Sequence, residues 1–226
     1  MKRPLIINFK NYLEVSAYHT IRLAKIAEKI ADNLRTEIVI APPQPSLLAV
    51  IQSVKLPVIC QHVDDSQIGS TTGFFIPEIA KSYGAVGSLI NHSEHRLDNK
   101  AIRNLVERLR NLEMVSIVCA RNAQEVADLV KLAPDFIAVE PPELIGSGKS
   151  VSKVNPLIII DSLQALAKNS TSTKMICGAG ITDKSDVTSA LQLGVDGILV
   201  ASSIVKATSW SEKISDLATG FEHFSS

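Results

Sequence analysis

Short apolar runs alternate with amphipathic stretches along the chain. Most of the runs are continuously apolar, which is typical of strands that are buried on both faces. Between them, apolar residues recur at helical spacing from Ile21 to Ile30, from Ile102 to Leu109 and from Leu163 to Ala167. The pattern predicts eight strands, at Leu5–Phe9, Ile38–Ala41, Pro57–Cys60, Val86–Ile90, Val115–Cys119, Phe136–Val139, Lys174–Cys177 and Gly197–Val200.

Repeated strand–helix alternation predicts a parallel sheet, because parallel neighbours need a crossover connection. Eight units favour a closed α/β architecture, the (β/α)8 barrel, over an open sheet. The chain of 226 residues is slightly shorter than the roughly 250 residues typical of that fold, so trimmed helices or loops are expected. No linker or low-complexity segment divides the sequence, and we therefore expect a single domain over residues 1–226.

Composition and charge exclude several classes of function. Lysine and arginine together equal aspartate and glutamate, 23 of each, without a long charged run, so we expect no nucleic-acid or anionic-membrane partner. No apolar stretch approaches the roughly 18 residues of a membrane span. The first residues, Met1 to Pro4, lead directly into a strand-like run, so no signal peptide is expected.

Three cysteines, Cys60, Cys119 and Cys177, each lie at the end of an apolar run. They are odd in number and form no CxxC motif. We expect them to be small buried hydrophobic side chains in a reducing cytoplasm, rather than to include a catalytic thiol.

A barrel places its chemistry at the C-terminal ends of its strands. A barrel would therefore bring to one rim the polar or glycine-rich residues that follow five of the eight apolar runs. These are Asn8-Phe9-Lys10, Asn91–Arg96, Glu140, Gly178-Ala179-Gly180 and Ala201-Ser202-Ser203.

Glu140 ends the sixth run and has the sequence context of a base attached to a lid. Pro141 and Pro142 stop the strand and stiffen the segment that follows. Gly146 and Gly148 then allow backbone N–H groups to approach a phosphate, because glycine has no Cβ. A solvated glutamate in a surface loop is the alternative for this motif taken alone.

Polar residues after the first and fourth runs suit the stabilisation of an oxyanion. His92 precedes an expected helix start, where the imidazolium form is disfavoured, so a neutral ring could donate a hydrogen bond. Lys10 places a fixed positive charge at the same rim, and Glu94 is the acidic residue expected in a first helical turn. Taken singly, a solvated rim lysine and a capping or core histidine are the alternatives.

After the last two runs, a glycine turn and a helix start predict an anion site. Backbone N–H groups of Gly178-Ala179-Gly180 and of Ala201-Ser202 would form it, although ordinary turn chemistry explains either piece alone. The strand ends together indicate a small phosphorylated substrate with a carbonyl. The glutamate would remove a proton beside the carbonyl, the histidine and lysine would stabilise the oxyanion, and the lid would exclude water.

These motifs resemble those of the triosephosphate isomerase family. Asn8-Phe9-Lys10, His92-Ser93-Glu94, Glu140-Pro141 with Ile145–Lys149, and Asp196–Val200 stand in the family's order at the family's strand ends. The likeness covers nearly the whole chain, and the short length and the Glu140–Leu144 segment are similar to the compact archaeal branch. The resemblance implies a TIM barrel that interconverts dihydroxyacetone phosphate and D-glyceraldehyde 3-phosphate through an enediolate, in glycolysis and gluconeogenesis, without metal or organic cofactor.

The resemblance also implies a role for each site residue. Glu140 is the base, His92 the electrophile and Lys10 the electrostatic stabiliser. Asn8 orients the substrate, and Glu94 supports Lys10. The substrate-binding residues would be Asn8, Phe9, Lys10, Ile145, Gly146, Gly180, Ala201 and Ser202.

Three departures from the family pattern concern the lid and the phosphate. Pro142-Glu143 stands where many relatives carry an aliphatic residue and tryptophan, so a stiffer hinge is expected. Gly178-Ala179-Gly180 replaces Gly-Gly-Ser, and Ala201-Ser202 replaces Gly-Gly. Phosphate contacts at these two places would come from the backbone.

The segment Gln61–Pro77 is long for a barrel loop. In the family this loop inserts into a neighbouring subunit, so the resemblance implies a homodimer or, as in the compact branch, a homotetramer. A self-packed surface loop is the alternative.

Two other classes of function stay open. An aldolase on the same barrel would use Lys10 or Lys174 as a Schiff-base nucleophile, which borohydride trapping would detect. A catalytically silent barrel would bind phosphate without needing Lys10, His92 and Glu140 together at the strand ends.

Overall fold

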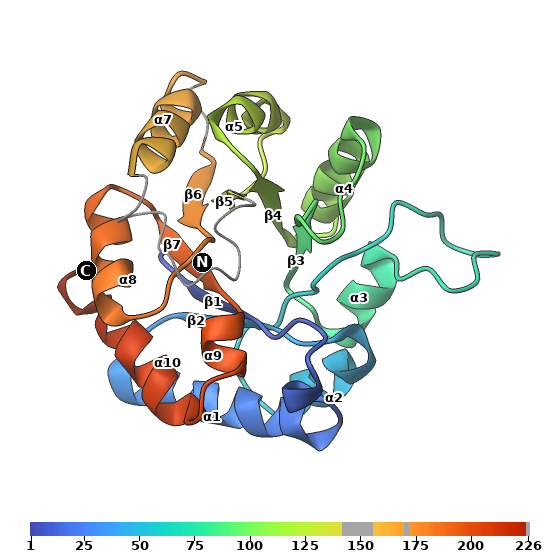
Figure 1. The fold of residues 1–226 in the computed structure, drawn as a ribbon. Coiled ribbons are helices and arrows are strands. Elements are labelled where there is room, and N and C mark those ends of the chain that lie inside the picture. Colours follow the sequence, from blue (N-terminus) through green and yellow to red (C-terminus); the bar gives the residue numbers. More distant parts are fainter. Residues whose placement is uncertain (142–155, 170–171, 225–226) are drawn as a thin grey trace.

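The computed structural model describes residues 1–141, 156–169 and 172–224, and a curled parallel sheet lies at its centre (Figure 1). Neighbouring strands pair in the order β2-β1-β7-β6-β5-β4-β3. All of these pairs are parallel, as the continuously apolar runs predict. The strands are β1 (Leu5–Asn8), β2 (Ile38–Ala41), β3 (Gly87–Ile90), β4 (Val115–Ala120), β5 (Phe136–Val139), β6 (Lys174–Cys177) and β7 (Gly197–Val200).

The predicted strand Pro57–Cys60 closes this sheet into a barrel. It lies between β2 and β3 and makes a single isolated bridge to each, rather than a full strand. The Ile59 N–H donates to the Ile40 carbonyl at 2.9 Å, and the Cys60 N–H donates to the Gly87 carbonyl at 2.9 Å. The predicted (β/α)8 barrel is therefore confirmed, and the other predicted strand ends differ from the observed ones by about one residue.

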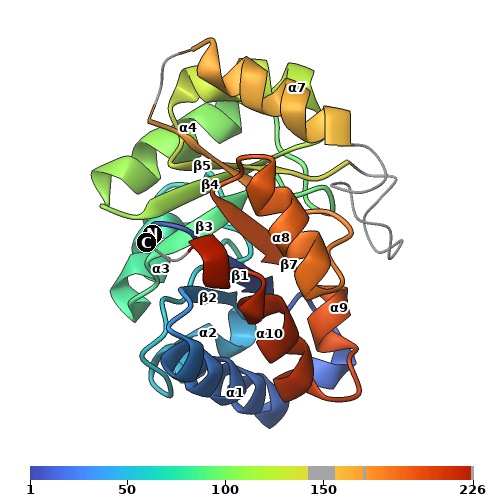
Figure 2. The same cartoon turned by 90° about the vertical axis from the view of Figure 1, so that its left-hand side faces the viewer.

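Helices cover the outside of the barrel (Figures 1 and 2). The three predicted amphipathic stretches lie in α1, α4 and α7. Side-chain oxygens of Asp98, Asn122 and Asp183 cap the starts of α4, α5 and α8 by accepting backbone N–H groups. Among the described helices, none combines the length and the apolar character of a membrane span. The helices are α1 (Tyr18–Leu34), α2 (Leu47–Ile51), α3 (Pro77–Tyr83), α4 (Asn99–Asn111), α5 (Ala123–Leu129), α7 (Pro156–Ala167), α8 (Lys184–Gln192), α9 (Ser202–Val205) and α10 (Trp210–Thr219).

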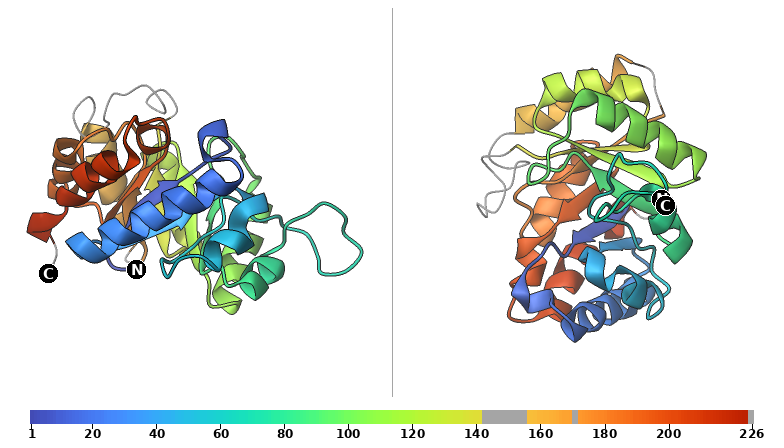
Figure 3. Two further views of the ribbon diagram at one scale, coloured as in Figure 1. Left: turned by 90° about the horizontal axis from the view of Figure 1, so that it is seen from below. Right: turned by 90° about the vertical axis from the view of Figure 1, so that its right-hand side faces the viewer.

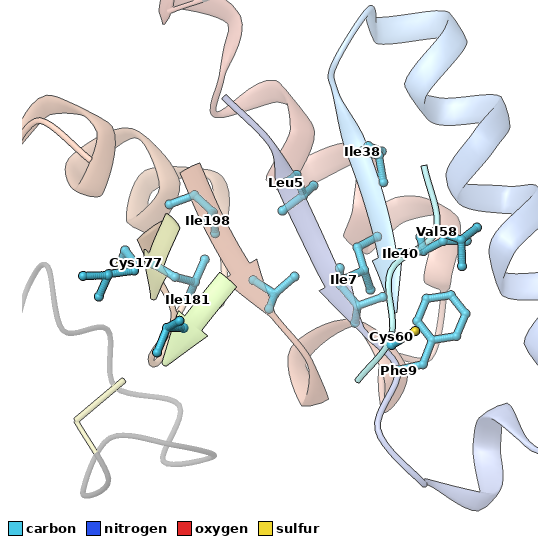
Figure 4. Packing of buried hydrophobic residues seen from close by; sticks show 14 of the residues in the cluster. Leu5, Ile7, Phe9, Ile38, Ile40, Val58, Cys60, Cys177, Ile181 and Ile198 are labelled. Atoms are coloured by element: carbon cyan, nitrogen blue, oxygen red, sulfur yellow. The ribbon is translucent and has the colours of Figure 1, made fainter. Parts of the chain in front are cut away.

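Alternation along the strands divides the core into two layers. One set of strand side chains packs outward against the helices, as Leu5, Ile7 and Phe9 do in Figure 4. The other set fills the inside of the barrel. This inner set includes Ile6, Val39, Ile59, Leu89, Ile117, Phe136, Ala138, Ile176 and Leu199.

The same alternation decides which strand-end residues face the barrel interior. Phe136 and Ala138 point inward from β5, so Glu140 follows on the same face. Asn8 follows Ile6 in the same way at the end of β1. The fold therefore directs the Glu140 carboxylate and the Asn8 amide into the mouth of the barrel.

The loop of residues 61–76 extends away from the barrel (Figures 1 and 3). At its base, the Asp64 N–H donates to the Phe75 carbonyl at 2.9 Å, and the Phe75 N–H donates to Asp64 Oδ2 at 2.7 Å. Arg108 on α4 donates to the Ser66 carbonyl at 2.6 Å and to both carboxylate oxygens of Glu78. These contacts fix the base of the loop within its own chain.

Truncation of a side chain inside the barrel should destabilise the protein. Ile117 is fully buried, so Ile117→Ala should lower the free energy of unfolding by about 2–5 kcal/mol. Leu157 on α7 is 63% exposed, and Leu157→Ala should change that free energy by less than about 0.5 kcal/mol. Denaturant unfolding at one fixed protein concentration measures both changes. An Ile117→Ala protein as stable as the parent would contradict the two-layer core.

Candidate active site

A pocket of about 430 Å³ opens at the C-terminal ends of the strands. The turn after β6 and the helix start after β7 form one wall, with Gly178, Gly180, Ala201 and Ser202 among its residues. The structure also brings to this pocket all five of the residues predicted to be catalytic: Asn8, Lys10, His92, Glu94 and Glu140.

The Glu140 carboxylate is buried in this pocket, with only 4% of the residue exposed. Its Oε2 atom has no hydrogen-bond partner among the described residues, and His92 Nε2 lies 3.5 Å away. A buried polar atom without a partner is costly, and buried ionisable groups in clefts are concentrated at functional sites. The carboxylate is thus free to accept a proton from a bound molecule.

The ring of His92 is oriented by the backbone that follows it. The Glu94 N–H donates to His92 Nδ1 at 3.2 Å, so Nδ1 uses its lone pair as an acceptor. The ring proton then sits on Nε2, the nitrogen nearer to Glu140. The loop itself is fixed by Asn91, whose side chain donates to the Cys119 carbonyl at 3.0 Å. The ring is therefore a neutral donor directed into the pocket.

Lys10 adopts a strained backbone conformation just after β1. Its φ is 50°, in the left-handed region that costs a residue with a Cβ about 1–2 kcal/mol. Asn8 Oδ1 accepts the Lys10 N–H at 3.0 Å, and Gln61 Nε2 donates to the Lys10 carbonyl at 3.2 Å. Lys10 Nζ pairs with Glu94 Oε1 at 2.7 Å. Together these contacts fix the ammonium group at the mouth of the barrel.

Gly178 leaves the space that Glu140 occupies, a role that sequence reasoning missed. A Cβ atom at this position would lie 2.5 Å from Glu140 Cγ, far inside van der Waals contact. The alternation along the strands contains the signal, because Ile176 points into the barrel and position 178 follows on the same face. Since β5 and β6 are neighbours, the two strand ends share one small volume.

The wall after β6 and β7 offers backbone N–H groups. Gly180 has a φ of 70°, so the turn adopts a conformation that glycine favours. In the described part of the chain, no side chain caps the start of α9 at Ala201, and the first amides of that helix, at Ser202 and Ser203, have no partner within it. Unpaired amides at a helix start attract anions. This wall suits a phosphate group, as the sequence predicts.

Of the remaining predicted substrate-binding residues, the structure describes only Phe9. The Phe9 side chain points outward from the barrel and is fully buried against the helices, so it does not line the pocket. Ile145 and Gly146 lie outside the described residues, as does the Pro142-Glu143 hinge.

Tyr12 and Lys206 also line the pocket, although no sequence motif singles them out. Lys206 Nζ lies 4.6 Å from the centroid of the Tyr12 ring. The contact joins the segments that follow β1 and β7, which are adjacent in the sheet. The two residues are far apart in the sequence, and only the closed sheet brings them together.

All three cysteines are free and buried, as the sequence predicts. Burial raises the pKa of Cys60 and of Cys177 to about 12. Burial also raises the pKa of Cys119 well above its usual value, and the negative charge of Glu140 adds to this rise. In the described ranges, no group of three or more histidine, cysteine, aspartate or glutamate side chains could hold a metal ion.

The native protein should therefore resist thiol alkylation. Thiols whose pKa lies near 12 remain protonated at pH 8, and burial also keeps the reagent away from the sulfur atoms. Iodoacetamide should label none of the three cysteines in the native protein and all three in denaturant, counted by mass spectrometry. Rapid labelling of native Cys60 at pH 8 would show that the segment closing the barrel is open.

Comparisons with known proteins show the family of the chain. The family model described as triosephosphate isomerase matches residues 4–217. The triosephosphate isomerase of Cenarchaeum symbiosum is 46% identical, over 95% of this chain and 96% of its own. The enzyme of Caldivirga maquilingensis is 44% identical, over 96% of this chain and 97% of its own. The enzyme of Methanothermus fervidus is 40% identical, over 97% of this chain and 99% of its own.

The likeness thus runs through the strands, the helices and the strand ends that form the pocket. With a glutamate, a neutral histidine and a lysine at the mouth of its barrel, the chain belongs to the triosephosphate isomerase family.

Proposed function

We propose that Glu140 is the general base of this triosephosphate isomerase. The reaction interconverts dihydroxyacetone phosphate and D-glyceraldehyde 3-phosphate, a step of glycolysis and gluconeogenesis. Glu140 takes a proton from the carbon next to the carbonyl, which leaves an enediolate, and returns the proton to the neighbouring carbon, while the hydroxyl proton passes from one substrate oxygen to the other. The unpaired and buried Oε2 atom is the observation that carries this proposal.

His92 and Lys10 stabilise the negative charge that develops on the substrate oxygen. The neutral imidazole donates its Nε2 proton to that oxygen without placing a full positive charge against the base. The Lys10 ammonium adds a fixed charge, and Glu94 holds it in place. Asn8 holds the backbone of Lys10 through Oδ1 and orients the substrate with its amide nitrogen.

The substrate's phosphate binds at the wall formed by Gly180, Ala201 and Ser202. Backbone N–H groups suit this task because their partial charges are fixed by the fold and need no side-chain ordering. The pocket of about 430 Å³ has room for a molecule of this size. The phosphate contacts predicted for Ile145 and Gly146 stay predictions from the resemblance.

The aldolase alternative meets two obstacles. Lys10 Nζ is engaged with a carboxylate oxygen at 2.7 Å, whereas a Schiff-base lysine has to present its nitrogen to the carbonyl. Lys174 lies at the start of β6, and its Nζ donates to the Met1 and Lys2 carbonyls at the opposite end of the barrel. A silent phosphate-binding barrel would not need an unpaired carboxylate beside a histidine.

Replacement of the base should separate chemistry from binding. Glu140→Gln keeps the shape of the side chain and removes its basicity, so kcat should fall by about 10²- to 10⁴-fold. The inhibition constant of glycerol 3-phosphate should change little, because the carboxylate acts on a carbon and not on the phosphate. A coupled assay with glyceraldehyde 3-phosphate measures both quantities.

The matched control is Glu107→Gln, which removes an exposed carboxylate on α4. It should leave kcat unchanged. Near-normal turnover by Glu140→Gln would contradict the assignment of the base, and no turnover by the parent would contradict the reaction.

We also propose that the chain forms a homodimer or homotetramer through the loop of residues 61–76. Ile68 and Phe74 on this loop are 70% and 55% exposed, so the loop offers two large apolar side chains that a second copy could cover. A second pocket, of about 800 Å³, lies beside the active site and is wide enough to receive the loop of another copy. It is lined by Asn8, Lys10, Asn11, Tyr12, Gln44, Pro45, Gln61, His62, Asp64, Gly73, His92, Glu94 and His95.

A charge on the loop should break this assembly. Phe74→Asp would place a carboxylate in the interface and should shift the protein toward monomers, as sedimentation velocity at micromolar concentration would show. Leu157→Asp, on the exposed side of α7, is the control and should leave the sedimentation coefficient unchanged. A parent protein that sediments as a monomer at that concentration would contradict the proposal.

A cytoplasmic location and a single domain over residues 1–226 complete the proposal. Three free, buried thiols suit a reducing compartment. The strands that pair around the barrel come from Leu5 near one end of the chain and from Val200 near the other. One continuous sheet supports one folding unit.

A further inference from the structure

Lys206 stands one helical turn after the residues that form the phosphate wall. The Lys206 N–H donates to the Ser202 carbonyl at 3.0 Å, so the two residues lie on the same face of α9. Helical side chains lean toward the helix N-terminus, and the Lys206 side chain therefore reaches back toward the pocket. It lines the pocket together with Gly180 and Ala201.

The ring of Tyr12 holds the Lys206 ammonium group. The distance of 4.6 Å from Nζ to the ring centroid is within the range of cation–π attraction. In the described part of the chain, no ion pair joins Lys206 to a carboxylate, although Glu212 lines the groove on its other side. The charge thus contacts an aromatic face, and no described carboxylate neutralises it.

Lys206 also balances the charge of the pocket. The described lining carries two lysines, Lys10 and Lys206, and two glutamates, Glu94 and Glu140. Because Lys10 is already paired with Glu94, Lys206 is the cation of the described lining that remains to offset an incoming phosphate dianion. Without it, the lining would carry a net negative charge and would repel that group.

We infer that Lys206, held by the Tyr12 ring, positions the phosphate of the substrate by its charge. This inference rests on the proposed function of the pocket. In the described lining, it adds a full positive charge to a wall that otherwise offers backbone N–H groups at Gly180 and Ser202 and neutral hydroxyl side chains. Lys206 is a positioning residue here, since it acts on the phosphate and not on the reacting carbon.

The test removes the charge and keeps the length of the side chain. Lys206→Met should raise KM for glyceraldehyde 3-phosphate and the inhibition constant of glycerol 3-phosphate by the same factor, about 3- to 10-fold, with little change in kcat. The factor should shrink at high ionic strength. Lys206→Arg should restore both constants. Lys29→Met, which removes an exposed lysine of α1, should change neither.

Glyceraldehyde, which has no phosphate, distinguishes an effect of the Lys206 charge on the phosphate from a structural effect of the substitution. Its kcat/KM, followed by NMR at high enzyme concentration, should be the same in the parent and in Lys206→Met. An equal loss for both substrates would show a structural role and overturn the inference. Unchanged KM and inhibition constants in an active Lys206→Met enzyme would also overturn it, whereas an inactive parent would refute the proposed function instead.

The Tyr12 ring has its own pair of variants. Tyr12→Phe keeps the aromatic face and should behave as the parent, whereas Tyr12→Leu should raise KM for glyceraldehyde 3-phosphate. In the Lys206→Met background, Tyr12→Leu should add no further effect, because the charge that the ring steadies is gone. Equal effects of Tyr12→Leu in both backgrounds would overturn the part assigned to the ring.

Discussion

Closure of the parallel sheet is the constraint on which the site depends. The Pro57–Cys60 segment hydrogen-bonds to strands on both sides and, in the described part of the chain, leaves the sheet without a free edge. A strand that is held from both sides cannot slip or rotate, so the alternation of its side chains is fixed to its last residue. That is why Glu140 and Asn8 turn inward at the mouth, and why position 178 has to be glycine.

Much of the pocket is held against local conformational preference. Lys10 and Asn91 have φ values of 50° and 61°, and Glu140 Oε2 is buried beside the His92 ring without a hydrogen-bond partner among the described residues. Features of this kind cost about 1–3 kcal/mol each, and the two-layer apolar core has to offset them.

The sequence predicts the barrel and the base because buried parallel strands are continuously apolar and end abruptly in polar residues. Other features depend on three-dimensional relations. Phe9 belongs to a recognisable motif, but the motif does not say that its side chain faces the helices. From the sequence, Gly178 is interpreted as part of a turn. The alternation of side chains along β6 shows instead that it faces Glu140. The contact between Tyr12 and Lys206 exists only because β1 and β7 are neighbours in the closed sheet.

Gln61 ties the projecting loop to the catalytic lysine. Its Nε2 group donates to the Lys10 carbonyl at 3.2 Å and to the Ala41 carbonyl at 3.0 Å, and the loop begins at this residue. If copies associate through the loop, an association that orders Gln61 also orders Lys10. The equilibrium of subunit association and the equilibrium of substrate binding are then thermodynamically linked. Linkage is reciprocal: bound substrate raises the affinity of the subunits for one another by the same factor by which association raises the affinity for substrate. Apparent substrate affinity would consequently fall when the enzyme is diluted below its own dissociation constant.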